Sequence, residues 1–160
     1  YLQEIAHTIN EAVYFGIPHD GEVLYIENLT PASSMSARNI LGEHAPMYCT
    51  GVGKAMLAFL PESEQEKVLS RPLTPFTENT IPTREALRED LARIRSRGYA
   101  IDNMEHEYGV TCIAIPVFGA DYRVVAAVSV SAPSLRFTPD VIARNARIMR
   151  EILGSAQYIL

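Results

Sequence analysis

A chain of 160 residues, with 48% hydrophobic and 21% charged side chains, has the size and composition of one globular domain. No apolar run approaches the ~20 residues that span a bilayer, and no signal-peptide pattern opens the chain, so we expect a cytoplasmic protein without membrane contact. Two cysteines, Cys49 and Cys112, exclude a disulfide-rich secreted scaffold. The formal charge of −5 argues against a nucleic-acid-binding surface on these residues, because such surfaces are usually basic.

The first part of the chain predicts a helix followed by a β-hairpin. Apolar residues recur at helical spacing over 1–9, and because the chain opens inside this pattern without Met, we expect it to be part of a longer protein. Residues 12–17 and 23–27 are predicted strands, joined by a turn that contains an Asp-Gly pair. A third short strand is expected around residues 34–38.

The middle of the chain predicts three helices. Thr50 opens the first, which runs to Leu60 and is stopped by a proline, and residues 62–69 form a short second helix. Thr83 opens a longer third helix, which Gly98 ends in the position that favours glycine.

The last part predicts a second hairpin and a final helix. Residues 109–117 and 123–131 are strands joined by a short turn, and Thr138-Pro139 is typical of a helix start. The inner stripe of this helix is predicted to hold Met149, Leu153 and Ala156. Since strands joined by tight turns are antiparallel, the expected fold class is α+β, with a central antiparallel sheet flanked by helices.

The strand over 123–131 is the most informative segment for function. Alternation of side chains separates an apolar face from a face of small side chains that ends in two hydroxyls. The apolar face holds Val124, Ala126, Val128 and Val130. The face of small side chains holds Val125, Ala127, Ser129 and Ser131. The second face favours an enclosed polar pocket beside Cys112, but its two hydroxyls could equally bond to a helix packed above them.

A glycine-rich helix start follows Thr50. Backbone N–H groups of Gly51 and Val52 would favour a small anion such as a carboxylate. The adjoining Gly-Lys pair is not a nucleotide-binding P-loop, because Tyr48 and Ala55 replace the glycine and the hydroxyl residue of that motif. Close helix packing is the alternative reason for glycine at this position.

Acidic residues and a histidine precede the strand that carries Cys112. Asp102, Glu105 and His106 could hold a metal, but no further His or Cys stands at ligand spacing, so we expect none. Cys112 with His106 could form a nucleophilic pair, although a cysteine within a buried strand is usually inert. We expect no catalytic residue and no cofactor.

Taken together, these segments resemble the C-terminal effector-binding domain of IclR-family bacterial transcription regulators. The resemblance covers nearly the whole chain, and Ala132 is a mild departure, standing where glycine is commoner. It rests on residues 42–58, 79–81, 95–102 with Glu105, 107–117 and 127–133.

This resemblance implies a GAF- or profilin-like fold over residues 1–160 that binds a small carboxylic or 2-oxo acid. It also implies a homodimer or homotetramer, whose operator DNA is bound by an N-terminal winged helix-turn-helix domain absent from these residues. The ligand-binding positions implied are Gly51, Val52, Asp102, Cys112, Ser129 and Ser131.

We expect an apolar pocket lining from Met35, Ile40, Met47 and Ile101. Two other functions remain as alternatives: a thiol-dependent hydrolase that uses Cys112 with His106, and an oligomerisation module that binds no ligand.

Overall fold

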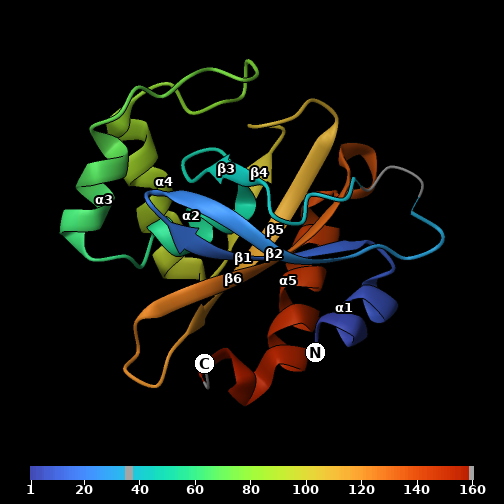
Figure 1. The fold of residues 1–160 in the computed structure, drawn as a ribbon. Helices are drawn as coiled ribbons and strands as arrows, with labels where there is room; N and C mark the ends of the chain where they lie inside the picture. Colours follow the sequence, from blue (N-terminus) through green and yellow to red (C-terminus); the bar gives the residue numbers. More distant parts are fainter. Residues whose placement is uncertain (35–37, 159–160) are drawn as a thin grey trace.

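A six-stranded antiparallel sheet forms the centre of the molecule in the computed structural model, which describes residues 1–34 and 38–158 (Figure 1). The strand order is β3-β2-β1-β6-β5-β4, and every neighbouring pair is antiparallel. The strands are β1 (Ala12–His19), β2 (Glu22–Leu29), β3 (His44–Pro46), β4 (Ala100–Asn103), β5 (Val110–Phe118) and β6 (Val124–Pro133). The predicted α+β class is thereby confirmed.

Helices cover both faces of this sheet. On one face α2 packs against the strands and α4 packs against α2, while α1 and α5 cover the opposite face (Figure 1). The helices are α1 (Leu2–Ile9), α2 (Gly51–Leu57), α3 (Glu62–Leu69), α4 (Arg84–Arg97) and α5 (Pro139–Leu153), with 3-10 turns η1 (Ser134–Arg136) and η2 (Gly154–Tyr158). Within the described residues, none of these helices combines the length and apolarity needed to cross a membrane.

Local sequence rules account for the helix ends near the sheet. The Thr50 hydroxyl accepts a hydrogen bond from the backbone N–H of Gly53 at 3.2 Å, and Thr83 caps α4 in the same way. Gly98 ends α4 with a φ of 84°, a conformation that glycine adopts without a steric penalty. These three expectations are confirmed.

The short strands at the sheet edges differ from the prediction. The third strand of the structure is β3, ten residues after Ser34, and neither Ser34 nor Arg38 belongs to a strand. The rest of the strand predicted over 34–38 lies outside the described residues. Strand β4 was not predicted, because four residues of mixed polarity give too short a pattern.

Two helices also end earlier than the sequence indicates. Helix α2 stops at Leu57, three residues before Leu60. Helix α5 stops at Leu153, so Ala156 lies in η2 and not on the inner stripe of α5.

The two faces of the sheet bound two separate cores. Ile113, Ile115, Val128 and Val130 pack toward α1 and α5, whereas Ala114 and Ala127 pack toward α2. The predicted alternation in β6 holds from Ala126 onward.

The alternation fails at the start of β6. Val124 belongs to the core beneath α2, and Val125 contacts the other core. The cause is a register shift in the β5–β6 pair between Val117 and Phe118 of β5. Because of this shift, β6 residues before Ala126 face the sheet side opposite to the one predicted.

Candidate functional site

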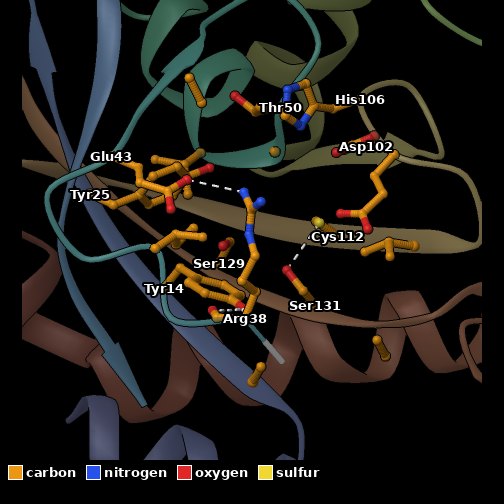
Figure 2. A pocket seen from close by; sticks show the side chains of 18 of the residues that line it. Tyr14, Tyr25, Arg38, Glu43, Thr50, Asp102, His106, Cys112, Ser129 and Ser131 are labelled. Atoms are coloured by element: carbon orange, nitrogen blue, oxygen red, sulfur yellow. Dashed lines mark hydrogen bonds and ion pairs between the residues drawn. The ribbon is translucent and has the colours of Figure 1, made fainter. Parts of the chain in front are cut away.

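A pocket lies where the start of α2 meets the sheet, and Ile40 and Glu43 from the segment before β3 also line it (Figure 2). Its cavity volume is about 150 Å³. Strands β1, β2, β4, β5 and β6 all contribute to its walls, so the pocket is assembled from residues far apart in the sequence. All six residues expected to bind a ligand line it: Gly51, Val52, Asp102, Cys112, Ser129 and Ser131.

The expected apolar lining is only partly present. Ile40 lines the pocket, and Met35 lies outside the described residues. Met47 does not line it, because its side chain is buried in the core beneath α2. Ile101 is also excluded, since its partner in the β4–β5 register is Ile113, which faces the opposite core.

The N-terminal end of α2 forms one wall of the pocket. Gly51 and Val52 are buried there, at the position where helical N–H groups have no partner within the helix. A Cβ atom on Gly51 would lie 3.1 Å from Cβ of Cys112, so glycine also permits close approach of α2 to β5. Close packing therefore accounts for this glycine, and anion binding by its backbone stays a prediction.

Two serines of β6 form the floor. The Ser131 hydroxyl donates to the sulfur of Cys112 across the β5–β6 pair, with Oγ and Sγ 3.0 Å apart. Ser129 is 3% exposed, and its hydroxyl has no hydrogen-bond partner among the described residues. Neither hydroxyl is bonded to a packed helix, and both serines line the cavity (Figure 2).

Asp102 brings a buried carboxyl group to the same wall. Burial, and to a lesser extent the neighbouring Glu105 carboxylate, together raise the pKa of Asp102 to about 7. The backbone N–H of Glu105 donates to Asp102 Oδ1 at 2.8 Å, which fixes the orientation of the carboxyl group. A protonated Asp102 can donate to a ligand oxygen and does not repel an anion.

A buried ion cluster lies next to Asp102 and was missed by the sequence analysis. Lys54 is 1% exposed, and its Nζ lies 2.7 Å from Oδ2 of Asp90 and 2.8 Å from Oε1 of Glu105. Glu105 in turn accepts from the backbone N–H of Asn103 at 3.0 Å. The cluster therefore ties α2 and α4 to the segment that carries Asp102.

Cys112 and His106 are poorly suited to nucleophilic catalysis. Burial and the nearby Asp102 carboxylate raise the pKa of the Cys112 thiol well above its ordinary value. Burial lowers the pKa of His106, whose ring packs 4.9 Å from that of Phe76. A thiolate nucleophile needs the opposite shift, so the geometry does not support the hydrolase alternative.

Charged residues at the pocket mouth were also missed. Arg38 and Glu43 both line the pocket and form an ion pair, with Nη2 and Oε2 3.0 Å apart (Figure 2). The Arg38 carbonyl accepts from the Tyr14 hydroxyl at 3.3 Å. An isolated charge in an irregular segment gives no periodic pattern, so only the fold reveals its position.

The described residues provide no metal site. Over 1–34 and 38–158, no group of three or more His, Cys, Asp or Glu side chains is arranged to hold an ion. Asp102, Glu105 and His106 do lie near one another in the sequence, but the Glu105 carboxylate is directed to Lys54.

The chain belongs to the IclR family of bacterial transcriptional regulators. The family model described as "Bacterial transcriptional regulator IclR C-terminal" matches residues 1–159. The HTH-type transcriptional regulator XynR of Escherichia coli (strain K12) is 36% identical over 137 residues, which cover 85% of this chain and 54% of that protein. The Transcriptional repressor IclR of Escherichia coli (strain K12) is likewise 36% identical, over 140 residues that cover 87% of this chain and 50% of that protein.

Solved structures show the same fold. The crystal structure of the Thermotoga maritima IclR has a TM-score of 0.89 and 34% identity, and the match covers 94% of this chain and 61% of that one. An IclR homolog from Microbacterium hydrocarbonoxydans, solved in complex with 4-hydroxybenzoate, has a TM-score of 0.82 and 25% identity over 91% of this chain and 60% of that one. The chain spans about half the length of the curated relatives that it matches.

Proposed function

We propose that this chain is the ligand-sensing domain of a longer IclR-type regulator, and that the pocket beside α2 binds a small carboxylic or 2-oxo acid. The observation that carries the proposal is the pocket itself, a cavity of about 150 Å³ with uncommitted polar groups on its walls. A cavity of roughly this volume can hold a molecule the size of benzene. Short acids such as pyruvate are within this limit, and a single-ring aromatic acid would extend from the cavity into its open side.

The chemistry of the walls favours an acid as the occupant. The N–H groups of Gly51 and Val52 and the Ser129 hydroxyl come from two adjoining walls, so together they can donate to the oxygens of one small molecule. The Ser131 hydroxyl, which donates to Cys112 in this structure, would join them by rotating toward the ligand. Cys112 adds a soft surface between these donors. The 4-hydroxybenzoate complex of a related regulator supports an aromatic or aliphatic acid of this size.

In the longer protein, ligand binding would act through the assembly. We expect a homodimer or homotetramer in the cytoplasm, with operator DNA bound by a winged helix-turn-helix domain outside these residues. The names of the relatives as HTH-type regulators, and their greater length, support this arrangement. A ligand that binds one conformation of the assembly more tightly would shift the population toward that conformation.

A thermal-shift screen tests the proposal. Pyruvate, glyoxylate, succinate, benzoate and 4-hydroxybenzoate would be compared with the corresponding primary amides at increasing concentration. A bound acid stabilises the folded domain by about 2.7 kcal/mol at 100 times its Kd. The unfolding midpoint therefore rises as the acid concentration increases. If no acid of this size moves the midpoint, the domain is an oligomerisation module and the proposal is wrong.

A further inference from the structure

The charges around the pocket are unevenly distributed. The lining includes the carboxyl groups of Glu43, Asp102 and Glu107, while Arg38 is the one lysine or arginine among the described residues that line it. An anion that enters this pocket therefore meets one guanidinium, the carboxylates of Glu43 and Glu107, and the rings of His44 and His106. Without that cation, the field inside the cavity would oppose an anion.

The nearest buried cation cannot take this role. Lys54 does not line the pocket, and its ammonium is already bound by Asp90 and Glu105 at 2.7 and 2.8 Å. A lysine that is neutralised in this way has little charge left to offer a ligand.

Arg38, by contrast, is only weakly engaged. Its side chain is 74% exposed and that of its partner Glu43 is 49% exposed, and ion pairs in such positions add little to stability. Glu43 is the only acidic partner of this guanidinium among the described residues, so most of its five N–H donors remain available. In Figure 2 the side chain extends between Tyr14 and Ser129 on one side and Cys112 and Ser131 on the other.

We propose that Arg38 binds the carboxylate of the effector and selects anionic over neutral ligands, while Glu43 competes with the effector for the same guanidinium. The inference rests on the proposed function of the pocket. With a single available cation, the pocket is suited to one anionic group, so the preferred class is a small monocarboxylic acid. The uncharged donors of α2 and β6 then serve the remaining oxygens of that acid.

The test measures binding of pyruvate, benzoate and 4-hydroxybenzoate, and of their primary amides, by calorimetry on the whole chain. Arg38→Gln should weaken binding of the acids by about 10- to 100-fold, the range expected for a charged hydrogen-bonding partner, and leave amide binding within about twofold. The affinity of Arg38→Lys for the acids should lie between those of the wild type and Arg38→Gln, because lysine keeps the charge and lacks the planar guanidinium. Glu43→Gln should strengthen acid binding.

A matched control is available on the opposite end of the sheet. Arg123 is 78% exposed and pairs with Asp121, so Arg123→Gln removes the same charge away from the pocket. It should leave acid binding unchanged, which separates direct contact from a general effect of net charge.

The outcomes distinguish the inference from the proposed function. If wild type binds an acid and Arg38→Gln binds it equally well, the role of Arg38 is overturned while the sensor function stands. Equal losses for acid and amide would also overturn it, because they would indicate a structural role. Unaltered acid binding by Glu43→Gln would contradict the competition. If no acid binds wild type, both proposals fail together.

Discussion

Lys54 Nζ lies 2.8 Å from Oε1 of Glu105, in a position where the lysine is 1% exposed. This pair connects α2, whose first residues line the pocket, with the segment that orients Asp102. A buried charge of this kind is stable only while its partners are present.

Replacing Lys54 should therefore strongly destabilise the domain. In Lys54→Met the buried Glu105 carboxylate loses its cation, and among the described residues Asp90 keeps only Arg93, at 3.4 Å. We expect a loss of about 3–5 kcal/mol in the free energy of unfolding. Urea denaturation measures this quantity. Lys67→Met removes an exposed lysine from α3 and should change stability little; comparable losses in both variants would contradict the importance of the buried cluster.

Asp102 should make stability depend on pH. Burial raises the pKa of Asp102 from 3.8 to about 7, so between these values the folded protein binds more protons than the unfolded chain. Stability contributed by the protonated group is therefore lost as the pH rises from about 4 to 7. At ~1.4 kcal/mol for each pH unit, the wild type should lose up to about 4 kcal/mol in the free energy of unfolding over this range. Asp102→Asn cannot ionise at this position and should not show this loss.

The measurement is urea denaturation of wild type and Asp102→Asn from pH 4 to pH 8. The variant should gain stability relative to the wild type as the pH rises to about 7, and the difference should level off above that pH. Asp121→Asn, at an exposed position in the β5–β6 turn, is the control and should follow the wild-type curve. A constant difference between Asp102→Asn and wild type would show that Asp102 is ionised throughout.

The two serines of β6 should contribute directly to ligand affinity. Ser129→Ala combined with Ser131→Ala should weaken binding of an acid found in the screen by about 1–3 kcal/mol, since each removes a donor to a charged group. Calorimetry gives the affinity, and circular dichroism checks that the fold persists. Ser70→Ala, an exposed serine after α3, serves as control. Unchanged affinity in the double variant would reject this floor as the binding surface.

Cys112 should react slowly with alkylating agents. Burial raises the pKa of its thiol, so the reactive thiolate is scarce at neutral pH. Iodoacetamide labelling at pH 7.5, followed by mass spectrometry, should be at least about tenfold slower in the folded protein than in urea. Rapid labelling that His106→Ala abolishes would instead support the thiol-dependent hydrolase.

The glycines of α2 should differ in their tolerance of a side chain. A Cβ on Gly53 would lie 2.4 Å from Cα and 2.6 Å from the carbonyl oxygen of Met47, and backbone atoms cannot move aside easily. A Cβ on Gly51 would meet its nearest atom at 3.1 Å. Gly53→Ala should therefore lower stability by about 1–3 kcal/mol or more, and Gly51→Ala by less. Thermal unfolding compares them, and equal midpoints would contradict the packing argument.

Local sequence patterns were sufficient for the elements whose residues fix their own structure. Thr50, Thr83 and Gly98 define helix ends through bonds and φ values within a few residues, and the two hairpins follow from strand alternation and short turns. The register shift before Phe118 could not be foreseen, because it depends on how β5 and β6 pair.

The site shows the same division. Gly51 and the serines of β6 were assigned to the pocket from the family resemblance, and these residues do line it. Lys54 and Arg38 were not singled out. Asp90 lies 36 residues from Lys54, and a helical lysine is usually solvated, so its burial is a property of tertiary packing alone.

The strand order has a consequence for the behaviour of the domain among its neighbours in the cell. The long apolar strands β5 and β6 occupy the interior of the sheet, while its outermost members β3 and β4 have only three and four residues. Exposed strand margins are templates for unwanted pairing with other chains, and short ones offer few unpaired backbone groups. The edges formed by β3 and β4 therefore offer few backbone groups for pairing with other chains.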